Sequence, residues 1–307
     1  MTNTPCHIPV MLKEVLASLS TQDGEVYVDA TFGNGGYSEA ILKSANCKVI
    51  AIDRDPSVKI RANEFKNTYG ERFEFRSGCF GDFSNIIKET INGAVFDIGV
   101  SSMQLDEAQR GFSFAKDAPL DMRMSSEGLS AYEIVNNYDE KELADIIFNY
   151  GEERKSRQIA SKIIEYRQKK HIETTKELAE IIYTVIHKKA GTIDPATRTF
   201  QALRIAVNNE LDELDKGLKG ATIRLSPAGR LVVVDFHSLE DRIVKNYMKE
   251  NSPKKTKISK YAPELIKHDC IFSEISKVIQ PTKEECLINP RARSAKLRYA
   301  VKGVFNE

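Results

Sequence analysis

The chain is predicted to form an α/β protein whose Rossmann-like parallel sheet carries an inserted all-helical domain. Strand-like and helix-like segments alternate over the N-terminal third of the chain, which is the pattern of βαβ units. From residue 105 to residue 213 no strand is evident, because residues 101–128 show little periodicity and helices follow. The apolar run 229–235 then resumes the sheet with a strand buried on both faces. We therefore assign residues 1–104 and 214–307 to the sheet domain and residues 105–213 to the insertion.

Each element has its own local signal. Short apolar runs mark the strands of the sheet domain, at residues 25–30, 48–53, 72–76, 94–98, 229–235 and 295–304. Apolar residues at helical spacing mark helices at residues 9–19, 36–44, 56–69 and 82–91, and from 238 onward. In the insertion, capping boxes mark helix starts, because Ser130, Asp139 and Thr174 each precede a glutamate by three residues. Asp194 before Pro195 marks a further start, with proline at the first helical position.

The most informative segment is 26–37, a strand that runs into a glycine-rich turn and a helix. A second strand closed by Asp53 follows, and this arrangement builds a nucleotide-type cofactor site at the carboxyl edge of a parallel sheet. Asp29 would repel the pyrophosphate of a dinucleotide, and Ser38 stands where the third glycine of G-x-G-x-x-G belongs. S-adenosylmethionine carries a sulfonium and an ammonium group, which a carboxylate attracts. The segment therefore predicts an S-adenosylmethionine-dependent methyltransferase, with a glycine turn in another α/β fold as the alternative.

The residues that follow each strand are candidates for contacts with this cofactor. Asp53 suits the ribose hydroxyl groups, and Phe80 could pack on the adenine. Asp82 either accepts from the adenine amino group or caps the next helix, and the cap is favoured. Cys79 has no obvious activating base, so covalent catalysis through a thiolate is not expected.

Asp97 is the candidate catalytic residue, because it follows the fourth strand, where the reaction type is set. Direct displacement on the sulfonium methyl group requires mainly positioning from the protein. If the acceptor is an exocyclic amine, a carboxylate that accepts its N–H would help to localise the nitrogen lone pair. The alternative for Asp97 is a structural acid at the end of a strand.

The helical insertion, residues 105–213, is expected to recognise a nucleic-acid substrate, and candidate contacts lie in the loop 110–123 and after the fifth strand. The loop mixes arginine and phenylalanine, which suits an extruded base stacked on an aromatic ring, with its phosphate held by arginine. The alternative is that the phenylalanines pin the loop to the core. His237 could also contact the substrate, or could be a helix-entry histidine satisfied by backbone. The residues concerned are Arg110, Phe112, Phe114, Arg123 and His237.

Composition describes an ordinary globular protein. Of 307 residues, 41% are hydrophobic and 29% are charged, with a net charge of only +1, so overall charge does not indicate a nucleic-acid partner. Basic residues gather locally, however, and such runs are either solvated faces or RNA-binding segments. They comprise Lys254, Lys255, Lys257 and Lys260 in one segment and Arg291, Arg293, Lys296, Arg298 and Lys302 in the other.

Cysteine and histidine usage argues against a structural metal or disulfides. The five cysteines form no C-x-x-C pair and the five histidines are isolated, so no metal site is expected. No signal-peptide pattern and no apolar run of ~20 residues are found, which favours a cytoplasmic protein without a membrane partner. The oligomeric state stays open, a homodimer included.

Taken in order, the motifs resemble those of the bacterial 16S ribosomal RNA cytosine-N4 methyltransferase family, over nearly the whole chain. They comprise residues 7–10, 29–37, 96–102, 110–114, 120–124, 151–154, 196–204, 236–242 and 289–294. The resemblance implies direct methyl transfer to the exocyclic amine of a cytosine in the decoding region of 16S rRNA, within the small ribosomal subunit. It also implies cofactor contacts at Gly35, Gly36, Tyr37, Asp53, Phe80, Asp97 and Gln104.

The chain departs from the family pattern at three positions. Many members have histidine where Tyr37 stands, so a backbone contact would survive there but an imidazole contact would not. Many have proline where Met103 stands, and glycine or arginine where Asn34 stands. A ribosome-assembly or RNA-binding factor that keeps the fold is the alternative function. A small-molecule methyltransferase is disfavoured by the basic C-terminal run with Arg291 and Arg293.

Overall fold

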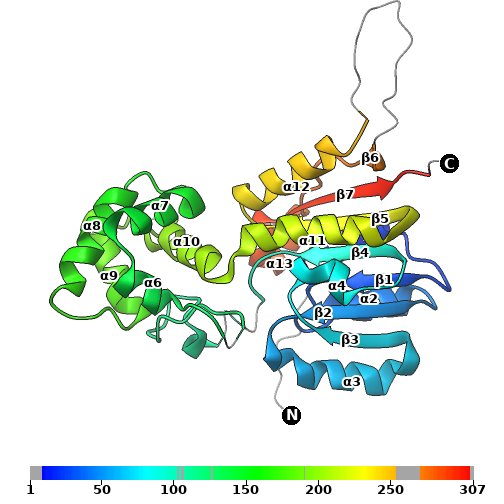
Figure 1. The fold of residues 1–307 in the computed structure, drawn as a ribbon, viewed down its shortest axis with the longest axis horizontal. Coiled ribbons are helices and arrows are strands. Elements are labelled where there is room, and N and C mark those ends of the chain that lie inside the picture. Colours follow the sequence, from blue (N-terminus) through cyan, green and yellow to red (C-terminus); the bar gives the residue numbers. More distant parts are fainter. Residues whose placement is uncertain are drawn as a thin grey trace, which may run out of the picture. The chain divides into compact units, whose positions relative to one another are not determined.

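The computed structural model describes residues 9–101, 104, 107–125, 127–189, 191–253 and 270–304. The chain divides into two compact units, which Figure 1 shows in ribbon form. Residues 1–99 with 211–307 form the sheet unit, and residues 100–210 form the helical unit. Both boundaries fall slightly before those expected from the sequence. No helix in the described part of the chain is long and apolar enough to cross a membrane.

The sheet unit contains a mixed seven-stranded sheet in the order β3-β2-β1-β4-β5-β7-β6. Strands β1 to β5 pair in parallel, whereas β7 is antiparallel to both of its neighbours. The strands are β1 (Val26–Asp29), β2 (Lys48–Asp53), β3 (Phe73–Ser77), β4 (Ile91–Asp97), β5 (Leu225–Asp235), β6 (Phe272–Ile275) and β7 (Lys296–Lys302). Because β1 to β5 are parallel, their carboxyl ends share one edge, and this confirms the predicted fold class.

Helices cover both faces of this sheet (Figure 1). One core contains apolar residues from α1 (Leu12–Leu19), α2 (Gly36–Ser44) and α3 (Lys59–Tyr69). The core on the other face contains residues from α4 (Phe83–Ile86), α11 (Glu210–Arg224) and α12 (Ser238–Glu250). A short helix, α13 (Lys283–Ile288), precedes a 3-10 turn at Pro290–Ser294. Strands β1, β2 and β4 and the last part of β5 are buried on both faces, which explains their apolar runs.

Several boundaries differ from the predictions. The helix predicted at 82–91 is confined to α4, because residues from Ile91 onward join the sheet as β4. Strand β6 was not predicted, since only its first residue, Phe272, is buried and its pattern shows no alternation. Helix α12 begins at Ser238 as predicted, with His237 as its N-cap.

The helical unit has its own hydrophobic core. Its helices are α6 (Ala131–Asn137), α7 (Glu140–Gly151), α8 (Ser156–Arg167), α9 (Thr175–Val185) and α10 (Ala196–Asn208). All three predicted capping boxes are present, at the starts of α6, α7 and α9. Asp194 accepts from the Ala196 N–H at 2.9 Å, as an N-terminal acid should, although Pro195 has helical dihedral angles and occupies the N-cap position.

Asn136 is a buried side chain that joins α6 to the segment before α9. Its Nδ2 donates to the Ile172 carbonyl at 2.9 Å, and its Oδ1 accepts from the Ile172 N–H at 3.0 Å. Both side chains are buried, at 8% exposure for Asn136 and 0% for Ile172. Asn136 therefore satisfies two backbone groups that have no access to water.

We predict that Asn136→Ala destabilises the helical unit by at least ~2 kcal/mol, because two buried backbone groups are left without partners. Chemical denaturation followed by circular dichroism measures this free energy of unfolding. Asn137→Ala is the matched control, since Asn137 is exposed on the same helix and should change stability by less than ~0.5 kcal/mol. Equal stability of the two variants would contradict the role of Asn136.

Candidate active site

Three acids end adjacent strands at the carboxyl edge of the sheet. Asp29 closes β1, Asp53 closes β2 and Asp97 closes β4. They lie close enough to interact, because the charge of Asp53 raises the pKa of Asp29 and the charge of Asp29 raises the pKa of Asp97. The edge is thus rich in carboxyl groups, and it suits a cationic ligand group better than a pyrophosphate.

The glycine-rich turn packs too tightly for larger residues. Gly35 has a φ of +81°, and a Cβ atom there would lie 2.5 Å from the ring of Phe65. A Cβ atom on Gly36 would lie 2.3 Å from the ring of Pro9. Both positions therefore require glycine because of close packing. Without side chains, the two glycines present only backbone groups at the N-terminus of α2.

The Asp53 carboxylate fixes the shape of this turn. Its Oδ2 accepts from the Gly33 N–H at 2.8 Å, and its Oδ1 accepts from the Asp55 N–H at 2.8 Å. Burial raises the pKa of Asp53, and these two hydrogen bonds act against that rise. The acid that the sequence assigned to a ribose is therefore also the link between β2 and the glycine turn.

Asp29 is fully buried and faces the first turn of α2. Its Oδ2 accepts from the Ser38 N–H at 3.1 Å and from the Ser38 hydroxyl at 2.7 Å. Burial raises its pKa to about 6 against the effect of these bonds. Asp29 thus anchors α2. Because its carboxylate already accepts hydrogen bonds from the protein, Asp29 would act on a ligand through its charge.

Asp97 differs from the other two acids. Its backbone N–H donates to the Thr31 hydroxyl at 2.8 Å, which holds the end of β4 against the loop after β1. Its Oδ1 is buried and has no hydrogen-bond partner among the described residues. Burial, together with the charges of Asp29 and Glu240, raises the pKa of Asp97 to about 8. This carboxyl oxygen has an unused capacity to accept a hydrogen bond or to face a cation.

The Tyr37 ring points into the protein. It is only 4% exposed, and its hydroxyl donates to the Val10 carbonyl oxygen. The next residue of that N-terminal segment, Met11, donates its N–H to Glu285 Oε1 at 2.6 Å. The Tyr37 side chain therefore holds residues 10–11 in place. Only the backbone groups of Tyr37 can contact a ligand.

Phe80 lies in the loop after β3 and packs against the core. Its ring meets Phe96 edge-on, with centroids 5.7 Å apart, and a Cβ atom on Gly217 would lie 2.9 Å from the same ring. The neighbouring Cys79 thiol donates to Glu213 Oε2 at 2.8 Å. Burial, together with this hydrogen bond, raises the pKa of Cys79 to about 11, so the thiol is protonated at neutral pH. Asp82 makes no side-chain cap to α4, so the favoured cap interpretation was wrong.

The other expected cofactor residue, Gln104, belongs to the helical unit. It is 6% exposed, and its Oε1 accepts from the Ser101 N–H at 3.0 Å. The preceding Met103 lies outside the described residues. The predicted cofactor residues are thus brought together in the sheet unit, except for Gln104.

The loop 110–123 is braced by its own side chains. Arg110 donates to the carbonyl oxygens of Arg123 and Met124 at 2.9 and 3.0 Å. Phe112 is 8% exposed, and Phe114 packs edge-on against Phe200 with centroids 4.9 Å apart. For both phenylalanines the structure therefore favours the interpretation that they pin the loop to the core.

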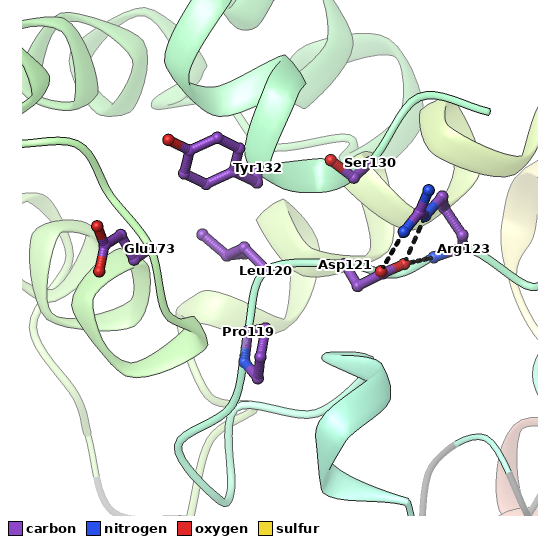
Figure 2. Close-up of a pocket in the computed structure, with 7 residues that line it drawn as sticks. All are labelled: Pro119, Leu120, Asp121, Arg123, Ser130, Tyr132 and Glu173. Carbon is purple, nitrogen blue, oxygen red and sulfur yellow. Dashed lines mark hydrogen bonds and ion pairs between the residues drawn. The ribbon is translucent and has the colours of Figure 1, made fainter. Parts of the chain in front are cut away.

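Arg123 lines a small pocket beside this loop (Figure 2). Its guanidinium pairs with Asp121, with Nη2–Oδ2 at 2.7 Å and Nε–Oδ1 at 2.9 Å. The cavity of about 170 Å³ is smaller than the ~300–1,000 Å³ of typical small-molecule sites. The lining residues are Pro119, Leu120, Asp121, Arg123, Ser130, Tyr132 and Glu173.

His237 is a helix cap. Its Nδ1 accepts from the Glu240 N–H at 3.5 Å and its Nε2 lies 2.9 Å from Glu240 Oε1. Glu240 is fully buried and accepts from the N–H groups of Phe236 and His237 at 2.9 and 3.2 Å. The structure thus favours the helix-entry interpretation. Glu240, and Asp235 at the end of β5, were not among the predicted site residues. Asp235 is buried with no partner for either oxygen among the described residues.

The basic C-terminal segment divides into two parts. Arg291 and Arg293 are exposed in the turn after α13. Lys296 and Arg298, in contrast, donate to the two oxygens of Asp241 at 3.0 and 2.8 Å, so they brace β7 against α12. The lysines at 254, 255, 257 and 260 lie outside the described residues.

Comparison with known proteins identifies the family. Residues 4–303 match the model of the MraW methylase family. The chain belongs to this family. It is 54% identical over 300 residues to the ribosomal RNA small subunit methyltransferase H of Rickettsia felis, covering 96% of this chain and 98% of that relative. The corresponding relative from Rickettsia canadensis is 52% identical over 303 residues, covering 97% of this chain and 98% of that relative.

The fold is also similar to that of an rRNA methylase of known structure from Streptococcus thermophilus. The identity is 12% and the TM-score 0.41, over 99% of each chain, and a likeness at this level carries no argument about function. Membership of the methylase family confirms the predicted cofactor, S-adenosylmethionine. The carboxyl-rich edge, the unpartnered Asp97 Oδ1 and the closely packed glycine turn all fit a cationic cofactor bound at this edge.

We predict that Gly35→Ala weakens both stability and cofactor binding. It combines left-handed backbone strain of ~1–2 kcal/mol with a collision against Phe65 of ~1–3 kcal/mol. Gly24→Ala is the matched control, because Gly24 has a φ of +80° but no atom within 4 Å of the added Cβ. It should show the backbone strain alone and leave the affinity for S-adenosylmethionine unchanged. Calorimetric titration and denaturation measure the two effects, and equal losses in both variants would contradict the packing argument.

Proposed function

We propose that this protein transfers a methyl group to N4 of a cytosine in the decoding region of small-subunit ribosomal RNA. The names of the curated relatives, at 52–54% identity over nearly the full chain, support ribosomal RNA as the substrate. The observation that carries the choice of an exocyclic amine is the buried, unpartnered Asp97 Oδ1 at the carboxyl edge of β4. An rRNA substrate would place the reaction in the cytoplasm.

The cofactor contacts follow from the edge of the sheet. In this proposal the Asp53 carboxylate binds ribose hydroxyl groups in addition to holding the glycine turn. Gly35, Gly36 and Tyr37 offer backbone at the N-terminus of α2, and Phe80 packs beside the adenine. Gln104, which the resemblance also implies as a cofactor contact, lies in the helical unit.

Asp97 has two proposed tasks at this edge. Its charge attracts the cationic part of the cofactor, and its oxygen accepts an N–H of the target amine, which orients the nitrogen lone pair. When bound, S-adenosylmethionine supplies the methyl group. The high pKa of Cys79, about 11, supports a mechanism without a covalent thiolate intermediate.

The proposed RNA contacts of the sheet unit are Arg291 and Arg293, which are exposed. In the helical unit, Arg123 borders the pocket of Figure 2 and could meet the RNA there. For Arg110, Phe112, Phe114 and His237 we propose a supporting role in substrate binding, because their side chains hold the loops that carry them.

Mapping of the methylated nucleotide tests this function directly. Purified small ribosomal subunits, and separately the deproteinised rRNA, are incubated with the protein and with cofactor labelled in the methyl group. We expect one labelled methyl group on N4 of a decoding-region cytosine, detected by nuclease digestion and mass spectrometry. Label on C5 or on another nucleotide would overturn the proposal. Subunit binding without any methyl transfer would instead favour the alternative, a ribosome-assembly factor.

Proton release tests the role of Asp97. Its pKa of about 8 in the cofactor-free protein means that it is mostly protonated at pH 7. A bound cation favours the carboxylate and lowers this pKa, so binding should release close to one proton at pH 7. For the same reason, affinity should rise as pH increases toward 8. Calorimetry in buffers of different ionisation enthalpy counts the released proton.

Binding of S-adenosylmethionine to the Asp97→Asn variant should release no proton at pH 7. The affinity of this variant for the cofactor should also vary less with pH. Asp235→Asn is the control, because burial and the charges of Asp241 and Glu240 raise the pKa of Asp235 to about 8 as well. Asp235 lies on the same strand face as Val233, opposite to the face of Asp97, so its substitution should leave the proton count unchanged. A wild-type protein that releases no proton at pH 7 would contradict the role of Asp97.

A further inference from the structure

Two connections of the helical unit, α7–α8 and α9–α10, lie side by side. Lys155 Nζ donates to the Val185 carbonyl at 3.1 Å, which joins the start of α8 to the end of α9. Arg198 Nη1 lies 3.6 Å from Glu153 Oε2, which joins the start of α10 to the α7–α8 connection. A Cβ atom on Gly151 would lie 2.5 Å from the Arg198 carbonyl oxygen, so the backbones are also close together. Four helix ends therefore meet at one place.

Cations gather where these helix ends meet, and we call them the helix-end surface. All of them are exposed. They are Arg154, Lys155, Arg157, Lys188, Lys189 and Arg198. The same connections carry the carboxylates of Glu152, Glu153 and Asp194, which leaves an excess of positive charge. Glu153 is 7% exposed and is used internally, since its Oε1 accepts from the Lys155 N–H at 2.9 Å.

Part of this charge has no counter-charge in the described structure. Lys188 pairs with Asp194 at 3.1 Å, and Arg198 pairs with Glu153. Among the described residues, Arg154, Lys155, Arg157 and Lys189 form no ion pair, although Lys155 donates to the Val185 carbonyl. The far end of α8 is different, because Lys162 and Lys169 lie 2.6 and 4.0 Å from Glu165. Cations without a counter-charge therefore occur together at the helix-end surface.

The placement of two of these cations opposes the helix dipole. A helix N-terminus favours acids and disfavours cations. The first turns of α6, α7 and α9 contain acids, as expected. The first turns of α8 and α10 contain none and carry Arg157 and Arg198 instead, although Asp194, just before α10, accepts from the Ala196 N–H. An anion bound here would relieve both the mutual repulsion of the cations and their repulsion by the dipoles.

We propose that the helix-end surface binds backbone phosphates of the RNA substrate. The inference rests on the proposed function, which supplies the polyanion. Exposed arginines can bind phosphate oxygens in a bidentate manner, and lysines add point charges. Phosphate contacts fix the position of a nucleic acid but carry no sequence information. The helical unit would therefore hold the RNA in place, while the sheet unit carries out the methyl transfer.

The test measures binding of the full-length protein to small ribosomal subunits at several salt concentrations. The triple variant Arg154→Ala, Arg157→Ala and Lys189→Ala removes three cations without an ion pair and keeps Lys155, whose Nζ joins α8 to α9. We expect at least tenfold weaker binding at low salt. The slope of log affinity against log salt should flatten by about 0.7–0.9 for each phosphate that the variant no longer neutralises. The midpoint of unfolding and the affinity for S-adenosylmethionine should stay at wild-type values.

Lys162→Ala with Lys169→Ala is the matched control, because it removes two cations from the same segment that pair with Glu165. This control should keep the wild-type slope. A triple variant that binds subunits with wild-type affinity and slope would overturn the proposal, as would equal competition by polyglutamate and by an rRNA fragment. If the wild-type protein binds the subunits but methylates another nucleotide, the proposed function is wrong. The phosphate-binding role of the helix-end surface would still be supported in that case.

Discussion

Burial of carboxyl groups at the carboxyl edge of the sheet is the constraint on which the candidate site depends. A buried charge is costly unless protein donors or a ligand compensate it. Asp29 receives N–H and O–H groups from Ser38, and Asp53 receives N–H groups from the glycine turn and the next turn. Asp97 receives none at its Oδ1 from the described residues. Two acids thus build the loop, and the third is the one whose chemistry a cationic ligand would complete.

The sequence predicted those strands and helices for which the local residue pattern agrees with the environment in the folded protein. Strands β1, β2 and β5 are continuous apolar runs because helices cover both faces, and the capping boxes depend only on neighbours three residues apart. Strand β6 was missed for the opposite reason. With one buried residue at the edge of the sheet, it carries no periodic signal, and pairing with β7 alone determines its conformation.

Side-chain roles were harder to predict than elements. The sequence shows that Tyr37 and Arg110 stand in motifs, but it does not show which partners they select after folding. The Tyr37 hydroxyl binds the Val10 carbonyl 27 residues away, and the Arg110 guanidinium binds backbone of its own loop. Such partners depend on packing between distant segments. A motif therefore indicated the candidate site, whereas only the fold distinguished residues that hold the loops from residues with capacity for a ligand.

The same distinction applies to charge. A basic run in the sequence suggests an RNA-binding segment, yet Lys296 and Arg298 are neutralised by Asp241 from a helix 55 and 57 residues earlier in the chain. The helix-end surface forms no such run, because two connections far apart in sequence contribute to it. Available charge depends on ion pairing in three dimensions. With a net charge of +1, the protein can still present a local cationic surface, because folding compensates some cations and leaves others together.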